Sequence, residues 1–139
     1  MILLVTHEVE FAKQMGRLLE AQGYPVMLAF DGSDVPALVT EVSPRLVIMN
    51  LYLQNPSGLE VLRQIRRHGY ARKIIVLAGY SASSEIQRAL LLGIDQVIGQ
   101  PVSFNQIISA VRVAIGPPPK NEVHIGRPSE YYSHLAKMP

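Results

Sequence analysis

The sequence predicts an α/β fold in which a five-stranded parallel sheet is covered by helices on both faces. Short, continuously apolar runs alternate with amphipathic stretches along the chain, and such runs are typical of strands buried on both faces. Repeated strand-then-helix units favour a parallel sheet with right-handed crossovers. Of the 139 residues, 48% are hydrophobic and 17% charged, which is enough for one domain with a substantial core.

The first strand is predicted over Met1–Val5, where every residue is apolar. A helix over Val9–Gln22 follows, because its apolar residues recur at helical spacing and Gly23 is a favourable C-terminal stop. The second strand is predicted over Pro25–Phe30, another apolar run.

A turn precedes the next helix, since Asp31 begins an Asp-Gly-Ser sequence of turn-forming residues. The helix itself is short and weakly indicated, over Asp34–Val42. The third strand is predicted over Leu46–Met49, the third helix over Gly58–His68, and the fourth strand over Ile74–Ala78. The third helix has apolar residues on one face and charged residues on the other.

The last three elements are a helix over Ser84–Leu92, a strand over Val97–Gly99 and a helix over Ser103–Ile115. Both helices begin with a Ser followed three residues later by a Gln, which is the pattern of a capping box. The pairs are Ser84 with Gln87 and Ser103 with Gln106.

In parallel sheets of this kind the functional side chains gather where the strands end at their carboxyl termini. The following residues stand at the carboxyl ends of the predicted strands. They are Thr6-His7-Glu8, Phe30-Asp31, Asn50-Leu51-Tyr52, Ala78-Gly79-Tyr80 and Gly99-Gln100-Pro101.

Composition excludes several other classes of protein. The chain has no cysteine, so disulfide scaffolds and thiolate metal sites are excluded. No apolar run approaches the ~20 residues of a membrane helix, and the chain does not start with a secretory signal. We therefore expect a cytoplasmic protein that is not associated with a membrane. Residues 1–115 form the expected domain, and the Pro-rich residues 116–139 form a tail or linker.

Several stretches resemble the receiver domain of response regulators, the CheY-like family. The apolar run ending at Asn50 and the helix from Gly58 are similar to its third strand and following helix. Gly99-Gln100-Pro101 resembles its fifth strand and cis-proline turn. The resemblance implies a doubly wound, flavodoxin-like sheet in the strand order 2-1-3-4-5. It also implies a place in a two-component or phosphorelay pathway.

A working receiver binds Mg²⁺ and accepts a phosphoryl group from a histidine kinase on an Asp at the end of the third strand. In this sequence the resemblance places Asn50 at that position. An amide does not ionise, whereas an Asp carboxyl with an ordinary pKa of ~3.9 does. The other positions that the resemblance marks are also changed: Thr6 and His7 replace two acids, Ala78 replaces a hydroxyl residue, Gln100 replaces a lysine, and Val97 replaces the switch aromatic.

These substitutions predict a pseudo-receiver that has no enzymatic activity, requires no cofactor and binds no Mg²⁺, because that cation prefers carboxylate oxygens. Glu8 is expected to point away from the pocket, since it begins a helix. His7 is then the titratable group of the pocket. It either acts as a pH sensor, a ligand for a soft cation or a base, or it is a neutral imidazole hydrogen-bonded to Asn50 or a backbone carbonyl, and we favour the neutral form.

The partner is expected to be another signalling protein, or a second copy that pairs through the face of the last two helices. Candidate contact residues on that face are Ile86, Gln87, Leu90, Leu91, Val97, Ile98 and Ile107. Two alternatives stay open: residual phosphoacceptor activity, and binding of an anion or of nucleic acid, which we expect less. The anion patch would consist of Arg63, Arg66, Arg67, Arg72 and Lys73.

Overall fold

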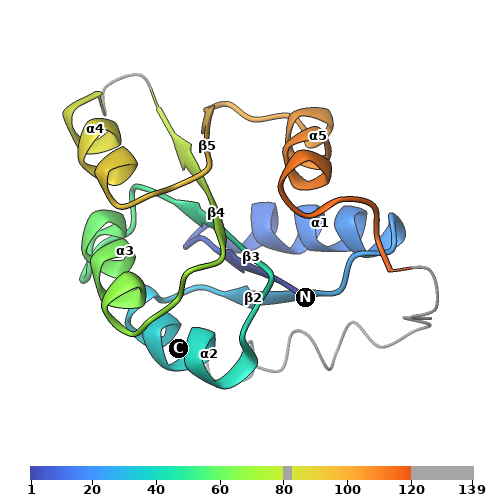
Figure 1. The fold of residues 1–139 in the computed structure, drawn as a ribbon. Helices are drawn as coiled ribbons and strands as arrows, with labels where there is room; N and C mark the ends of the chain where they lie inside the picture. Colours follow the sequence, from blue (N-terminus) through green and yellow to red (C-terminus); the bar gives the residue numbers. More distant parts are fainter. Residues whose placement is uncertain (80–82, 120–139) are drawn as a thin grey trace.

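The fold is one parallel sheet with helices on both sides (Figure 1). The structure, a computed structural model, describes residues 1–79 and 83–119. The strand order is β2-β1-β3-β4-β5, which confirms the predicted topology. In chain order the elements are β1 (Ile2–Val5), α1 (Val9–Ala21), β2 (Val26–Ala29), a 3₁₀ turn (Gly32–Asp34), α2 (Val35–Val42), β3 (Leu46–Asn50), α3 (Gly58–Arg67), β4 (Lys73–Ala78), α4 (Ser83–Leu91), β5 (Gln96–Gly99) and α5 (Phe104–Ile115).

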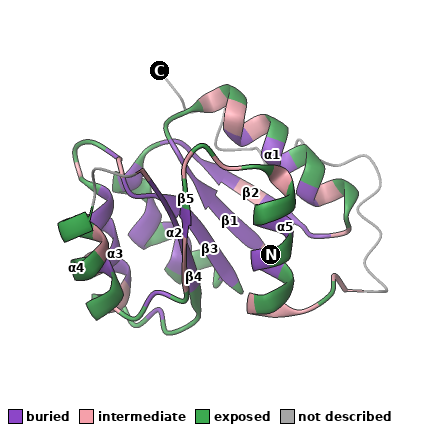
Figure 2. Cartoon of the chain, turned by 90° about the horizontal axis from the view of Figure 1, so that it is seen from above, coloured by how far each residue is buried: buried purple, intermediate pink, exposed green. Residues whose placement is uncertain are grey.

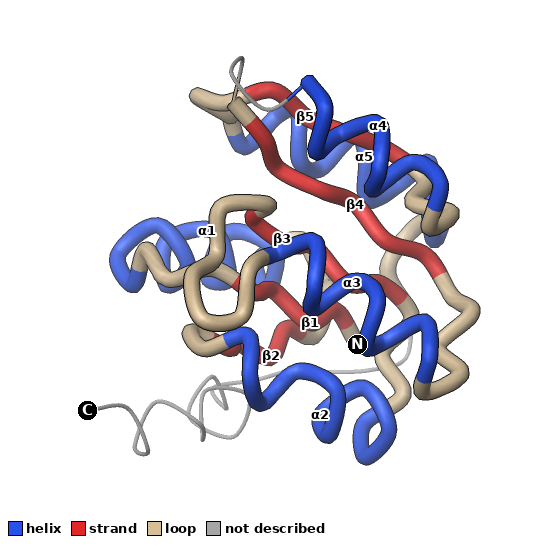
Figure 3. The backbone as a smooth tube through the Cα atoms, turned by 90° about the vertical axis from the view of Figure 1, so that its left-hand side faces the viewer, coloured by secondary structure: helices blue, strands red, loops and turns tan. Residues whose placement is uncertain are grey.

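β1 and β3 are buried on both faces, as their apolar composition predicted (Figure 2), whereas the edge strand β5 is only partly buried. Successive side chains point to opposite faces. Ile2 and Leu4 therefore pack with α1 and α5, while Leu3 and Val5 pack with α2, α3 and α4. Figure 3 shows the helices flanking the red strands of the sheet. No helix in the described part of the chain is both long and apolar enough to cross a bilayer.

Two helix starts test the capping predictions. Ser103 is the N-cap of α5: its side chain accepts from the Gln106 amide, and the Gln106 side chain accepts from the Ser103 amide, so this capping box is confirmed. The prediction for Ser84 was wrong, because α4 begins one residue earlier, at Ser83, and Ser84 lies inside the helix.

The chain after α5 is attached to the neighbouring turn between α1 and β2. Tyr24 is only 1% exposed, and its hydroxyl donates to the Gly116 carbonyl over 2.6 Å. Pro118 packs so closely on Gly23 that a Cβ at Gly23 would lie 3.0 Å from Pro118 Cβ. The described beginning of the predicted tail is therefore attached to the turn between α1 and β2. Residues 120–139 of that tail lie outside the described residues.

Candidate functional site

The predicted pocket residues come together at the carboxyl edge of the sheet. β1 and β3 are paired through Val5 and Met49, so Thr6 and Asn50 follow on adjacent strands. Thr6 is 0% exposed and Asn50 is 2% exposed, and they are the buried polar residues among those described. The sheet register thus places these two residues next to each other at the carboxyl edge, where the sequence predicted the pocket.

Both ends of the Asn50 amide are bound within the protein. Its Oδ1 accepts a hydrogen bond from the Tyr52 amide over 2.9 Å. Its Nδ2 donates to Glu8 Oε1 over 3.3 Å. A buried amide is stable only when its donors and acceptors are partnered, and here Tyr52 and Glu8 supply those partners.

The prediction that Glu8 points away was wrong. The Glu8 amide donates to Thr6 Oγ1 over 3.2 Å, and the Glu8 backbone is extended at the start of α1. This turn directs the Glu8 carboxylate back toward Asn50. The site therefore holds a carboxylate that the sequence analysis placed elsewhere.

The expected role of His7 also needs correction. Its side chain is exposed, and the Asn50 amide nitrogen donates to Glu8 in place of the imidazole. Among the described contacts, no hydrogen bond joins His7 to Asn50, one of the two partners expected for its imidazole. The titratable group that faces Asn50 is the Glu8 carboxylate.

Sequence analysis missed the role of Tyr52. The phenol oxygen of Tyr52 accepts from the Gly79 amide over 3.1 Å and donates to the Gly79 carbonyl over 3.2 Å. A Cβ at Gly79 would lie 3.3 Å from the phenol oxygen, so glycine allows the ring this close approach. Tyr52 thereby joins the loop after β3 to the end of β4. In the sequence, the signals for this contact were a tyrosine two positions after Asn50 and a glycine directly after β4.

The other pocket positions contribute little polarity. Ala78 is buried at 1% exposure and carries no hydroxyl. The Gln100 backbone amide donates to the Ala78 carbonyl over 2.9 Å, and the Gln100–Pro101 peptide bond is cis, as expected. Val97 is half-buried and packs against the core beneath α2, α3 and α4.

Comparison with known proteins identifies the family. Residues 2–112 match the family described as the response regulator receiver domain. The chain belongs to this family.

Known receiver proteins support the assignment. The photosynthetic apparatus regulatory protein RegA of Rhodobacter capsulatus is 29% identical over 129 residues, which cover 91% of this chain and 70% of RegA. The transcriptional regulatory protein DltR of Streptococcus agalactiae is 32% identical over 112 residues, which cover 81% of this chain and half of DltR. The chain thus spans only part of each of these regulators.

Solved structures share the fold. The receiver domain of NtrX from Brucella abortus superposes with a TM-score of 0.76 at 24% identity, covering 83% of this chain and 98% of that domain. A response regulator receiver domain protein from Clostridium thermocellum gives a TM-score of 0.76 at 25% identity, covering 82% of this chain and 92% of that one. Receiver domains are generally non-enzymatic modules of two-component signalling and interact with other signalling proteins.

The donor set does not fit the Mg²⁺ ion that the receiver family implies. Mg²⁺ requires hard oxygen ligands in near-octahedral geometry. Glu8 supplies the carboxylate among the described contacts of Asn50, and its Oε1 accepts a hydrogen bond from the Asn50 amide. The described residues contain no cluster of His, Cys, Asp or Glu that is large enough to hold a metal. Thr6 Oγ1 already accepts the Glu8 amide.

The predicted partner face is only partly a surface. Ile107 is 0% exposed and Ile98 is 8% exposed, so both belong to the core and are wrong as contact residues. Both pack in the layer beneath α1 and α5. The exposed apolar side chains of this region are Leu90 and Leu91 on α4, at 52% and 87% exposure, and Val113 on α5, at 80%. Gln87 is exposed and Ile86 is half-buried.

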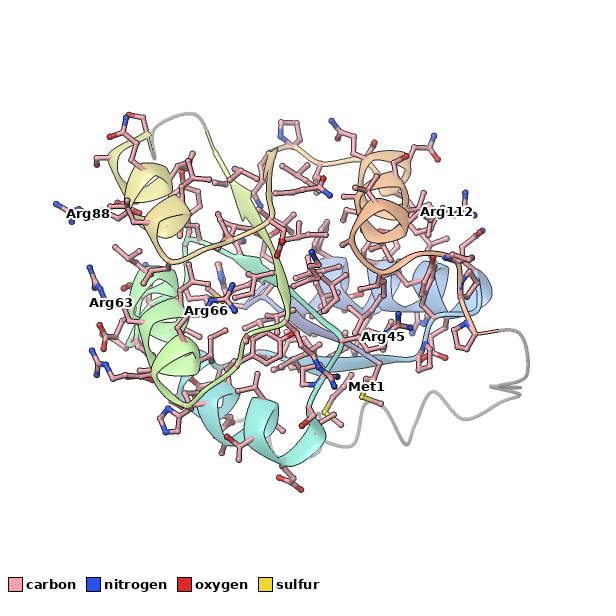
Figure 4. All side chains as sticks on the ribbon, viewed as in Figure 1. Met1, Arg45, Arg63, Arg66, Arg88 and Arg112 are labelled. Carbon is pink, nitrogen blue, oxygen red and sulfur yellow. The ribbon has the colours of Figure 1, made fainter. Side chains whose placement is uncertain are left out.

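One residue of the predicted anion patch, Arg66, is bound to the backbone of the fold. The guanidinium of Arg66 donates to four backbone carbonyls, at 2.7 to 3.1 Å: those of Leu92, Gly93, Tyr70 and Arg72. Arg66 thus joins the end of α3 to the loop after α4. Figure 4 shows it turned inward, whereas Arg63 and Arg88 point outward.

The neighbours of Arg66 also have structural partners. Arg63 lies 3.5 Å from a Glu60 carboxylate oxygen on the same helix. Tyr70 donates to the Pro44 carbonyl over 3.0 Å, and its burial raises the pKa of its hydroxyl, which keeps the proton on this donor. Arg67 is exposed. Arg66 is therefore engaged within the fold, and anion binding by the other four residues stays a prediction.

Proposed function

We propose that this receiver domain acts without phosphorylation, as a cytoplasmic protein-interaction module of a two-component or phosphorelay pathway. Its partner is another signalling protein or a second copy. The observation that carries the proposal is the bonding of Asn50, the residue at the phosphoacceptor position. Its amide is buried and is bound by Tyr52 on one side and Glu8 on the other.

An amide in this position cannot act as a carboxylate nucleophile. Phosphoryl transfer to an Asp forms an acyl phosphate on an ionised oxygen, whereas the Asn50 Oδ1 is neutral and accepts the Tyr52 amide. The negative charge nearest to it is the Glu8 carboxylate. A phosphoryl group carries roughly −1.5 to −2 charge at neutral pH, so Glu8 would repel it.

The groups that would stabilise a bound phosphoryl group are also missing or engaged. Ala78 carries no hydroxyl, and Gln100 carries no charge. The Gly79 amide, which points into the same region, already donates to the Tyr52 phenol. The polar atoms of Thr6, Asn50 and Gly79 therefore have partners without any ligand, and this supports a pocket that is stable when empty.

The surface for partner binding is the region of Leu90, Leu91 and Val113. Exposed apolar side chains are characteristic of interaction sites, and these three lie on α4 and α5, the helices that precede and follow the edge strand β5. A shallow groove between β5 and α5 runs beside Val113, lined also by Val97, Gly99 and Ser109. No part of this surface depends on a phosphoryl group, so we propose that it is available in a single conformation of the domain.

The test is a titration of the ¹⁵N-labelled chain with Mg²⁺ and fluoroberyllate, a phosphoryl mimic, observed by amide NMR. We expect no site-localised shifts at Asn50, Gly79 or Gln100. An active receiver domain titrated in parallel is the positive control. Saturable shifts confined to these residues would overturn the proposal in favour of residual phosphoacceptor activity.

A further inference from the structure

A groove with a cationic rim lies at the amino edge of the sheet, the edge opposite the Asn50 pocket. Its lining consists of Arg45, Arg72, Lys73, Ala114 and Ile115. Its volume is about 360 Å³. We propose that this groove docks an acidic segment of a partner protein. The inference does not depend on the proposed function, because no residue of the phosphoacceptor pocket takes part.

The sheet register places the backbones of two arginines next to each other at this edge. β3 and β4 are paired from Leu46 and Lys73 onward. Arg45 and Arg72 each stand one position before the first paired residue of β3 and β4. They are therefore neighbours where these two strands begin. Both residues line the groove together with Lys73, so an anion bound there meets three cationic side chains.

The cationic side chains are held in place by contacts to the fold. Arg45 Nη2 donates to the Ile115 carbonyl over 3.0 Å. Arg72 Nη1 donates to the Ser43 carbonyl over 3.0 Å. A guanidinium carries five N–H donors, so each arginine keeps donors that these contacts do not use. Figure 4 shows Arg45 beside Met1 at this edge.

One carboxylate competes for the cations. Asp95 Oδ1 lies 3.5 Å from Lys73 Nζ, and this ion pair is half exposed on the lysine side. Asp95 Oδ2 also accepts a hydrogen bond from the Ile74 amide over 2.8 Å, which fixes the carboxylate to the backbone of β4. Its single charge offsets Lys73 and leaves Arg45 and Arg72 without a carboxylate among their described contacts.

The shape and chemistry of the groove favour a peptide over a small anion. Its floor consists of the half-buried Ala114 and Ile115, and its rim consists of guanidinium and ammonium groups. A groove that is open to solvent does not enclose a small ligand as pockets for such ligands do. In a peptide that combines carboxylates with apolar side chains, the apolar side chains can pack on Ala114 and Ile115. The carboxylates can pair with the arginines in a bidentate manner.

The test uses the full chain and a twelve-residue peptide of alternating Glu and Leu as the probe. Amide NMR and isothermal calorimetry report site and affinity at 50 and 300 mM NaCl. We expect shifts at residues 45–46, 72–74 and 113–116, with weaker binding at the higher salt concentration. The double substitution Arg45→Gln with Arg72→Gln is expected to weaken binding about tenfold.

The matched control is Arg67→Gln with Arg88→Gln, which removes the same charge from exposed positions elsewhere and is expected to change affinity less than twofold. If the double variant at the groove does not fold, Lys73→Gln provides the second test, with a smaller loss of affinity. Equal binding of a Gln–Leu peptide, or shifts outside the groove, would overturn the proposal.

Two further outcomes would replace the proposed occupant. Tighter binding of a 20-base-pair DNA duplex than of the acidic peptide, lost in the same groove variant, would assign the groove to nucleic acid. Self-association in sedimentation, abolished by the groove variant, would assign it to a second copy, whose exposed Glu10, Asp31 and Asp34 would supply the carboxylates.

Discussion

Asn50→Asp tests whether the phosphoacceptor pocket has lost its function through charge. The substitution replaces the Nδ2 nitrogen with a carboxylate oxygen, which then lies 3.3 Å from Glu8 Oε1. Like charges at this distance repel by about 1 kcal/mol in water-like surroundings, which is the appropriate limit because Glu8 is exposed. Loss of the hydrogen bond adds about 1 kcal/mol. We therefore expect the free energy of unfolding to fall by about 2 kcal/mol, and the melting temperature by roughly 6 to 10 °C.

Urea unfolding at pH 7, followed by circular dichroism, measures this loss. Glu8→Gln alone is the matched control, and the double variant completes a thermodynamic cycle. In the double variant the glutamine amide can donate to the carboxylate introduced at position 50, so we expect it to recover at least about 1 kcal/mol. An Asn50→Asp variant as stable as the natural chain would show that Glu8 does not face position 50.

The same variant is not expected to gain phosphoacceptor activity. Asn50→Asp supplies a nucleophile, but Ala78 and Gln100 still lack the hydroxyl and the charge of an active pocket, and Thr6 and His7 still replace its two acids. Incubation with a radiolabelled small phosphodonor and Mg²⁺ provides the assay. Acid-labile label at position 50 of this single variant would refute the proposed function.

Removing any of three other contacts is expected to lower the stability of the fold. Tyr52→Phe removes both bonds to Gly79 and should cost about 1 to 2 kcal/mol, with faster amide exchange at Gly79; unchanged exchange would argue against the contact. Arg66→Met keeps the aliphatic stem but removes four carbonyl bonds, so chemical denaturation should show a loss of about 2 to 3 kcal/mol, and Arg66→Lys should recover little of it. Tyr24→Phe breaks the bond to Gly116 and should lower stability by about 1 kcal/mol while increasing ¹³C relaxation-detected motion at residues 116–119; if those residues move equally in both proteins, Tyr24 does not hold them.

The sequence was sufficient for the sheet because burial on both faces leaves little choice of residue. Each predicted strand lies within one or two residues of an observed one, since apolar runs bounded by turn residues mark the strands directly. The α5 cap was equally local: Ser103 and Gln106 are three residues apart and form their bonds without help from the rest of the fold.

The corrections concern contacts that local patterns do not encode. The direction of Glu8 depends on one hydrogen bond from its own amide to Thr6, and helix periodicity says nothing about it. Arg66 lies in a cluster of basic residues in the sequence, yet the carbonyls of Leu92 and Gly93, about 26 residues away, determine its role. Ile98 belongs to the core because it faces α5 from β5. The strand is at the edge of the sheet, so apolar composition alone could not decide which of its side chains are covered.

The bonding of the pocket bears on how such a domain is controlled. Thr6, Glu8, Asn50, Tyr52 and Gly79 form one chain of hydrogen bonds that joins the ends of β1, β3 and β4. A ligand shifts a conformational equilibrium only through its different affinities for two states, and a pocket whose polar atoms are already partnered offers a phosphoryl group little to gain. Under the proposed phosphorylation-independent function, control would lie at surfaces away from the pocket. The cationic groove includes Ala114 and Ile115, which directly follow the exposed Val113 on α5, so we expect partners bound at these two surfaces to interfere with each other.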